Sequence, residues 1–193
     1  RNIGRFRINV YRQRGEVALV VRYIRSRIPG IEELNLPPLL EELVMEPRGL
    51  ILVVGPAGSG KSTTLAAMIE HRSRSRSGHI LTIEDPVEYL HEHHRSVISQ
   101  REVGFDTLSY AAALRRAMRQ APDVILIGEI RDRETMEQAI SYANTGHLCL
   151  STLHATNANQ TGNKAGDLSH LVTHIIQVII DGVKRFIGCV GSC

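Results

Sequence analysis

A glycine-rich run places a lysine and two hydroxyl groups where phosphate chemistry needs them. Its members, with the threonine that follows it, are Gly55, Pro56, Ala57, Gly58, Ser59, Gly60, Lys61, Ser62 and Thr63. They fit the P-loop pattern G-x-x-x-x-G-K-S/T, in which glycines let backbone N–H groups wrap around phosphates at a helix N-terminus. Lys61 would reach the β- and γ-phosphates, and the Ser62 hydroxyl would bind Mg²⁺. The alternative, a glycine-rich turn without a ligand, does not explain Lys61 or the flanking strand and helix patterns.

A hydrolytic site also needs carboxylates that hold the metal and orient a water molecule. Residues 123–129 have the pattern of a buried strand that ends in Glu129. Ligands of open α/β sheets bind at the carboxyl ends of the strands, so this position suits a site. A common form of the pattern has an aspartate where Gly128 stands. We therefore expect Glu129 to take part in the coordination shell of Mg²⁺.

Three more carboxylates fall within five residues at the end of a second predicted strand. They are Glu84, Asp85 and Glu88, and Pro86 directs the chain out of any helix. An ordinary acidic turn is the alternative interpretation. The position of this segment between the P-loop and residues 123–129 favours a functional one.

Two histidines lie at opposite ends of the next strand pattern, residues 148–153. His147 precedes the strand and His154 follows it. A single histidine is more often structural than functional, but this strand is adjacent to the predicted nucleotide edge. His154 is therefore a candidate for sensing the γ-phosphate.

The elements that must position these residues alternate between strands and helices from Gly49 onward. Strands are predicted over 50–54, 80–83, 124–127 and 148–153, and helices over about 61–71, after Asp106 and after Asp132. Such alternation predicts an α/β fold with a mainly parallel sheet covered on both faces. The basic run 72–77 is predicted to be a solvated turn, and a membrane or nucleic-acid contact is the alternative.

The chain divides into four segments. Residues 1–28 are predicted to form a β-hairpin, which is too small to be a domain by itself, and residues 29–48 to form a linker with an amphipathic helix. Residues 49–160 form the α/β core, and residues 161–193 are predicted to be a divergent helical tail with Ile175 and Ile179 on its inner face. A zinc site in this tail is disfavoured because the usual C-x-x-C spacing is absent; its ligands would be His170, His174, Cys189 and Cys193.

The composition excludes several classes of protein. The 193 residues suffice for one globular domain with a fragment of another, and no apolar run is long enough to span a bilayer. A net charge of +3 and 4% aromatic residues argue against a nucleic-acid partner. Three cysteines and no signal peptide indicate a reducing compartment, and from the initial arginine we expect an N-terminal portion that is either missing or processed away.

Taken in order, four motifs resemble those of the twitching-motility ATPases of type IV pili, the PilT and PilU branch of the type II/IV secretion ATPase superfamily. They are the P-loop and residues 83–88, 119–132 and 145–154, and the resemblance covers roughly residues 3–160. It implies a P-loop NTPase with a RecA-like core, preceded by an N-terminal domain that ends with the hairpin of residues 1–28. It also implies hydrolysis of ATP, with Mg²⁺, that powers pilus retraction. It further implies a cytoplasmic homo-hexamer whose partner is the pilus platform in the inner membrane. Peripheral association with that membrane is compatible with the resemblance.

The resemblance assigns roles position by position. Glu88 matches the family's catalytic glutamate, and Glu129 matches the glutamate of its second nucleotide motif. His147 and His154 match its histidine motif, so His154 is expected among the catalytic residues, and Glu84 and His147 among those that bind the nucleotide. Arginines of the N-terminal domain reach a neighbour's nucleotide in this family; the candidates are Arg5, Arg7 and Arg22.

Other features refine or oppose this expectation. Short phrases such as Gly78-His79-Ile80 resemble PilU-type members more than PilT-type ones. Beyond Gln160 the sequence does not resemble the family's continuation, so one alternative is a truncated nucleotide-binding subunit without useful turnover. A RecA-like nucleic-acid translocase is a second alternative. A small-molecule kinase is disfavoured because no lid or acceptor pocket is recognisable.

Overall fold

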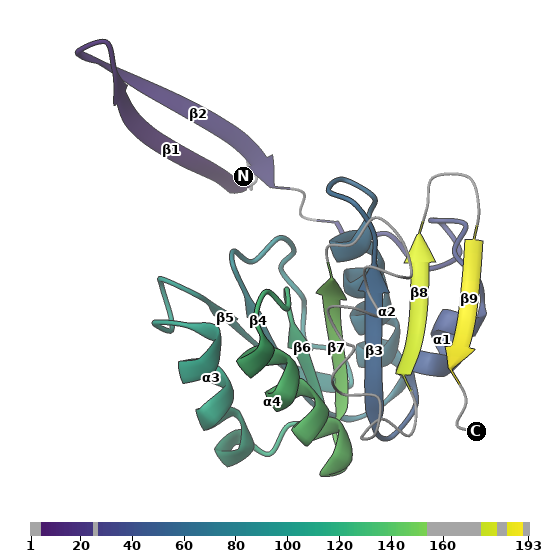
Figure 1. Ribbon diagram of the computed structural model, residues 1–193. Helices are drawn as coiled ribbons and strands as arrows, with labels where there is room; N and C mark the ends of the chain where they lie inside the picture. Colours follow the sequence, from purple (N-terminus) through teal and green to yellow (C-terminus); the bar gives the residue numbers. More distant parts are fainter. Residues whose placement is uncertain (1–4, 25–26, 154–174, 181–184, 191–193) are drawn as a thin grey trace.

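The computed structural model describes residues 5–24, 27–153, 175–180 and 185–190, with the backbone alone from residue 175 onward. These residues form a two-stranded hairpin and an α/β unit (Figure 1). The hairpin pairs β1, Arg5–Gln13, with antiparallel β2, Glu16–Ile24, and extends away from the α/β unit. Arg14 and Gly15 join the strands with φ of 51° and 82°, the left-handed conformation that two-residue hairpin loops favour. The predicted hairpin is confirmed.

A seven-stranded sheet forms the centre of the α/β unit. Its strands are β3 Gly49–Val54, β4 Gly78–Glu84, β5 Ser96–Glu102, β6 Val124–Ile127, β7 Leu148–Leu153, β8 Ile175–Ile180 and β9 Arg185–Val190. They lie in the order β5-β4-β6-β7-β3-β8-β9, and all neighbours are parallel except β8 and β9. The predicted α/β class and mainly parallel sheet are confirmed.

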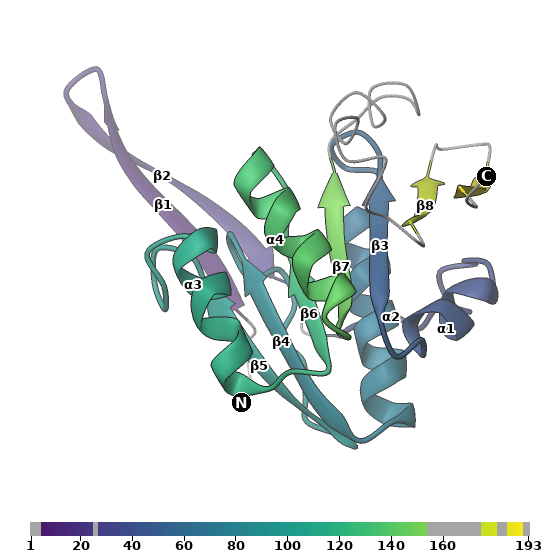
Figure 2. The same ribbon diagram turned by 60° about the horizontal axis from the view of Figure 1, so that its bottom comes forward.

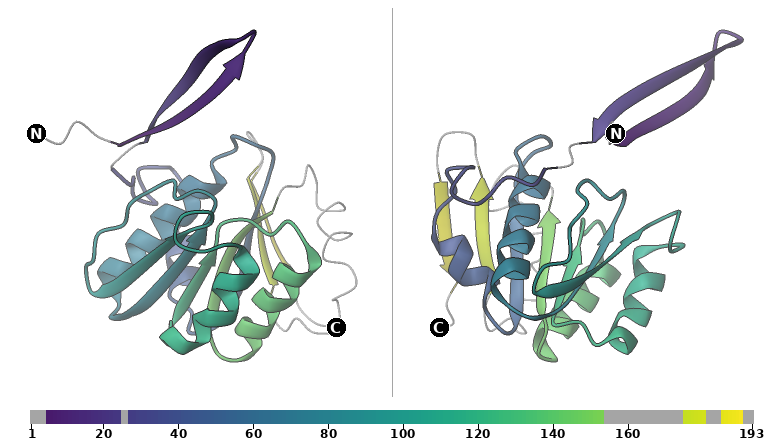
Figure 3. Two further views of the ribbon diagram at one scale, coloured as in Figure 1. Left: turned by 90° about the vertical axis from the view of Figure 1, so that its left-hand side faces the viewer. Right: turned by 180° about the vertical axis from the view of Figure 1, so that it is seen from behind.

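Helices cover both faces of this sheet (Figure 2). On one face lie α3, Tyr110–Ala117, and α4, Arg133–Asn144; a short 3-10 turn, Met118–Gln120, follows α3. On the other face lie α1, Leu39–Val44, and α2, Lys61–Ser75 (Figure 3). The side chains of Ser109 and Asp132 accept hydrogen bonds from backbone N–H groups and so fix where α3 and α4 begin.

Alternate residues of the strands face the two helical layers. In β3, Leu50, Leu52 and Val54 belong to the core under α3 and α4, whereas Ile51 and Val53 belong to the core under α1 and α2. Each of these five side chains is at most 2% exposed. A strand that is apolar on both sides is typical of a covered parallel sheet. The sheet is therefore a rigid frame, and the loops at its carboxyl edge start from fixed points.

The structure corrects the prediction of a solvated turn over residues 72–77, because α2 continues to Ser75. Arg72 is 2% exposed, and its guanidinium donates hydrogen bonds to the backbone oxygens of Val44 and Glu46. A buried arginine needs such partners because an unpaired buried charge is costly. Arg72 therefore joins α2 to the end of α1 and is not part of a solvated loop.

The prediction of a helical tail is wrong for Ile175–Ile180, which forms strand β8 and pairs in parallel with β3. This hexapeptide is rich in β-branched residues, which favour strands, and that preference outweighs the helical spacing of Ile175 and Ile179. Strand β9 then extends the sheet. The side chains of the four conceivable zinc ligands are not described. His154 also lies outside the described residues.

Candidate functional site

The three predicted chemical segments meet at one edge of the sheet. The P-loop follows β3, the acidic segment follows β4, and Gly128 and Glu129 follow β6. These strands run parallel through the shared neighbours β6 and β7, so their carboxyl ends lie together (Figure 1). Parallel topology thus brings residues from three distant parts of the sequence to one place.

The P-loop has the backbone conformation that phosphate binding requires. Gly58 and Gly60 have φ of 76° and 91°, values that residues with a side chain adopt only with strain. A Cβ atom built on either glycine meets nothing within 4 Å, so the space beside the loop is open. Helix α2 begins at Lys61, and no side chain caps its N-terminus. The N–H groups of the first turn are therefore available to an anion.

The side chain of Lys61 folds back onto the P-loop. Its side chain is buried, with 6% exposed, and the ammonium donates hydrogen bonds to the backbone oxygens of Gly55 at 3.0 Å and Pro56 at 2.7 Å. Burial lowers the pKa of Lys61, and the nearby Glu129 carboxylate opposes this by raising it. The loop thus holds a desolvated cation that a phosphate group would neutralise.

A cavity of about 30 Å³ joins the P-loop helix to the acidic segment. Its lining includes Ser62, Glu84, Glu88, Gly128 and Thr152, which come from four different elements or their ends. Such a volume has room for a water molecule, and its walls are polar enough to bind one. The structure therefore brings the predicted metal-binding serine and two predicted carboxylates together.

The two carboxylates in this cavity have different surroundings. Glu84 accepts hydrogen bonds from the Thr82 hydroxyl at 2.7 Å, from the Gln100 amide at 3.4 Å and from the Glu88 backbone N–H at 3.4 Å. Burial raises the pKa of Glu84, and these hydrogen bonds oppose the rise. Glu84 thus holds the turn in place, whereas the half-buried Glu88 carries the carboxylate that the turn presents.

Arg131 joins the ends of β4 and β6, a role that the sequence analysis does not assign. Its Nε donates to Glu129 at 3.0 Å, and its Nη1 lies 3.6 Å from an oxygen of Asp85. The hydrogen bond to Glu129 and the surrounding negative charge raise the pKa of Arg131. Its charge and its position two residues after Glu129 are the only signals in the sequence, and they do not show which carboxylates it contacts.

Crowding explains why glycine stands at position 128. A Cβ atom at this position would lie 3.2 Å from the Glu84 Cα, 3.2 Å from the Tyr110 hydroxyl and 3.3 Å from the Ile83 carbonyl oxygen. The Gly128 N–H also donates to that same carbonyl at 2.8 Å. The aspartate of the common pattern does not fit here without movement of β4.

The donor set fits a magnesium–nucleotide complex. Among the residues with described side chains, no group of three or more His, Cys, Asp or Glu side chains could hold a metal ion alone. Mg²⁺ needs no such group, since it commonly takes one or two protein ligands and completes its shell with phosphates and water. Ser62 at the start of α2 and Glu129 at the end of β6 are the residues that would serve it.

Other predicted residues do not join this edge. His147 precedes β7, and its carbonyl accepts from the N–H of Gly49 at the start of β3, so it lies at the amino edge of the sheet. The structure therefore does not bring His147 to the P-loop edge, and its predicted contact with the nucleotide stays a prediction. His154 lies outside the described residues. Arg7 and Arg22 are paired across the hairpin, which extends away from the α/β unit (Figure 1), and the Arg5 side chain is not described.

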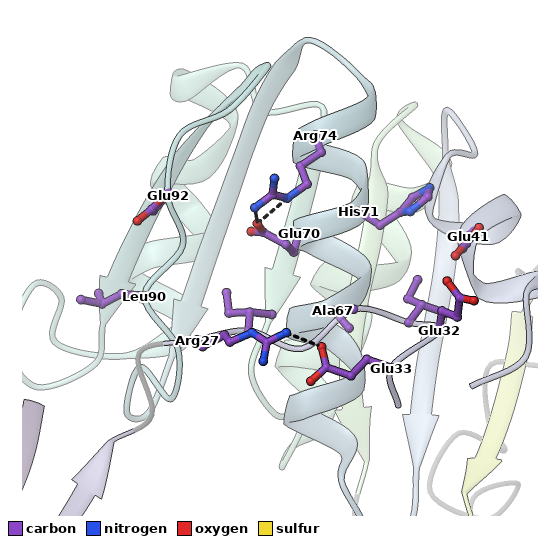
Figure 4. A pocket seen from close by; sticks show the side chains of 13 residues that line it. Arg27, Glu32, Glu33, Glu41, Ala67, Glu70, His71, Arg74, Leu90 and Glu92 are labelled. Carbon is purple, nitrogen blue, oxygen red and sulfur yellow. Dashed lines mark hydrogen bonds and ion pairs between the residues drawn. The ribbon is translucent and has the colours of Figure 1, made fainter. Parts of the chain in front are cut away.

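A larger cavity, of about 620 Å³, lies between α2 and the linker that precedes α1 (Figure 4). Its lining includes several carboxylates, but Glu33 is paired with Arg27 at 2.8 Å and Glu70 with Arg74 at 2.7 Å. No P-loop residue reaches it. The chemistry that the sequence predicts is concentrated at the carboxyl edge and not in this cavity.

Comparisons with known proteins agree with this geometry. The model of the family described as "Type II/IV secretion system protein" matches residues 6–184. The match thus continues past Gln160, where the sequence analysis expected no likeness. The chain is 56% identical over 160 residues to the type IV pilus ATPase PilU of Pseudomonas aeruginosa, covering 83% of this chain and 42% of that protein.

Two further comparisons involve PilT. The chain is 46% identical over 166 residues to the type IV pilus retractation ATPase PilT of the same species, covering 86% of this chain and 48% of that protein. A crystal structure of the pilus retraction motor PilT with bound ADP has a TM-score of 0.86 and 44% identity, covering 98% of this chain and 60% of that one. The chain spans about half the length of the curated relatives that it matches.

Proposed function

The chain belongs to the family of type II/IV secretion system proteins, and on this premise we propose that it is an ATP-hydrolysing motor subunit that powers type IV pilus retraction. The observation that carries this proposal is the cavity shared by Ser62, Glu84 and Glu88. A phosphate-binding helix and a carboxylate that faces it are the minimum that hydrolysis of a phosphoanhydride needs.

Each residue at the edge has a distinct part in this proposal. Lys61 exchanges its two carbonyl acceptors for phosphate oxygens of ATP and neutralises their charge. Ser62 and Glu129 would hold Mg²⁺, which would screen the negative charge of the phosphates. Glu88 accepts a proton from the attacking water, and Glu84 fixes the turn through the Glu88 N–H.

We further propose a PilU-type role in a homo-hexamer that acts on the inner-membrane platform of the pilus. The higher identity to PilU than to PilT supports the first part. In such a ring, His154 and hairpin arginines such as Arg7 would complete a nucleotide site. No helix in the described ranges has the length and apolar character needed to cross a membrane. We propose that attachment at the cytoplasmic side of the membrane runs through the platform.

The test is phosphate release from Mg-ATP by the purified full chain, with sedimentation to measure its assembly. We expect release that depends on Mg²⁺ and does not change when single- or double-stranded DNA is added. Stimulation by DNA would favour a nucleic-acid translocase. Tight ATP binding without phosphate release would favour a subunit that binds but does not turn over.

A further inference from the structure

The loop that carries Glu88 is hydrogen-bonded along one side to the sheet. This acidic loop, residues 85–95, runs from β4 to β5. The Val87 N–H donates to Glu102 at 3.1 Å, and the His91 N–H donates to the Gln100 side chain at 2.9 Å. Gln100 in turn donates to the Tyr89 carbonyl at 2.8 Å. Strand β5 thus fixes the path of the loop along the sheet.

The other side of the acidic loop is held by α2. The hydroxyls of Thr63 and Tyr89 are 3.0 Å apart at the first turn of the helix. Farther along the same helix, the two oxygens of Glu70 face two histidines of the loop. His94 Nε2 lies 2.8 Å from Oε1, and His91 Nδ1 lies 3.8 Å from Oε2. The helix that begins at the P-loop therefore also holds the loop that carries Glu88.

Glu70 is half-buried and yet remains charged. Its side chain is 14% exposed, and that of His91 is 3% exposed. His91, together with His94 and Arg74, lowers the pKa of Glu70 to about 2, against the opposing effect of burial. Figure 4 shows Glu70 and Arg74 pointing toward each other on α2. Among the described residues, His91 Nδ1 has no hydrogen-bond partner, and the Glu70 carboxylate 3.8 Å away is the charged group that faces it.

We propose that Glu70 is a positioning residue for hydrolysis, which acts through His91 and His94 to hold the acidic loop, and with it Glu88, at a fixed distance from the P-loop. This inference rests on the proposed function. A helix is a rigid spacer, so a contact at Glu70 fixes the loop relative to Lys61 at the start of that helix. His91 also lines the small cavity beside Glu88, so its ring transmits this contact directly.

The proposal predicts an effect on the chemical step and not on binding. Glu70→Ala leaves the phosphate contacts of the P-loop intact, so affinity for Mg-ADP changes by less than about twofold. It releases one side of the acidic loop, and a displacement of Glu88 near 1 Å would lower kcat by at least about tenfold. Glu70→Gln supplies an oxygen for one histidine and an NH₂ for the other, so it restores kcat to within about threefold of wild type.

The experiment compares wild type, Glu70→Ala, Glu70→Gln and the control Arg74→Ala in the full chain. Arg74 pairs with the same carboxylate but its side chain is 63% exposed, and its removal leaves both histidine contacts. Phosphate release gives kcat, mant-ADP titration gives affinity, and hydrogen–deuterium exchange reports on the amides of Val87, Glu88 and His91. Lowered kcat with unchanged affinity and faster exchange in Glu70→Ala alone supports the proposal.

Wild-type kcat and unchanged exchange in Glu70→Ala would overturn the positioning role. An equal loss of kcat and affinity, with a lowered melting temperature, would also overturn it, because that result describes a merely structural residue. If wild type binds mant-ADP but releases no phosphate, the proposed hydrolysis is refuted. The exchange of the acidic loop then decides the positioning role by itself: faster exchange in Glu70→Ala supports it, and equal exchange overturns it.

Discussion

Replacement of Lys61 by methionine should separate nucleotide binding from folding. Methionine keeps most of the aliphatic length of the buried lysine but removes its charge. In the structure, that charge has two backbone acceptors, the carbonyls of Gly55 and Pro56, and lies near the Glu129 carboxylate. The substitution therefore acts on a group whose best partner is the phosphate of a ligand.

The magnitudes follow from the environment of Lys61. Each charge-assisted hydrogen bond to a phosphate contributes about 1.5–3 kcal/mol, so loss of contacts to two phosphates costs at least about 3 kcal/mol. This corresponds to at least about a hundredfold loss of Mg-ATP affinity. For folding, the substitution removes two hydrogen bonds to carbonyl oxygens, but it also removes the cost of burying the charge, which lowers the Lys61 pKa. The two effects oppose each other, so the free energy of unfolding changes by about 1 kcal/mol or less.

The assay is titration with mant-ATP and Mg²⁺, alongside urea denaturation of the same samples. Arg116→Met is the matched control, because it removes an exposed cation on α3, far from the P-loop helix. We expect the control to bind like wild type. Affinity of Lys61→Met within fivefold of wild type would refute the assignment of the P-loop.

Three further substitutions test the architecture around the site. Arg72→Met leaves the carbonyls of Val44 and Glu46 without their donor and should lower the free energy of unfolding by about 2 kcal/mol; an unchanged urea midpoint would contradict this. Gly128→Ala forces a Cβ against β4 and should cost about 1–3 kcal/mol and also lower turnover, while a stable and fully active variant would show that β4 yields easily. Because burial raises the Glu84 pKa, its contribution to stability is present below pH 4.5 and is lost as the pH rises through the folded-state value. Glu84→Gln should therefore be at least as stable as wild type at pH 7 and lose less stability between pH 4.5 and 7, as urea midpoints at both values would show.

The sequence predicted the parts of the site that depend on local spacing. The P-loop is contiguous, and Glu88 and Glu129 lie within four residues of the ends of apolar strands whose parallel arrangement brings these ends together. Local pattern and topology were sufficient for these residues. The same reasoning does not bring His147 to this edge, because His147 precedes β7 and only the carboxyl ends of the strands lie at the P-loop.

The remaining features depend on contacts between distant segments. Strand β5 is polar and was not recognised, although Gln100 and Glu102 hold the acidic loop. The burial of Arg72 depends on carbonyls at the end of α1, and the role of Glu70 depends on histidines more than twenty residues away. Neither hydrophobic period nor motif spacing contains this information.

The central claim is that Glu88 acts on an ATP molecule bound by the P-loop. The most direct test measures Mg-ATP affinity and phosphate release for wild type and Glu88→Gln in the full chain. A glutamine can hydrogen-bond the attacking water but is a far weaker base, so we expect equal affinity and a loss of turnover of at least about a hundredfold. Equal turnover in the two proteins would contradict the account and transfer the role of base to Glu84 or Glu129.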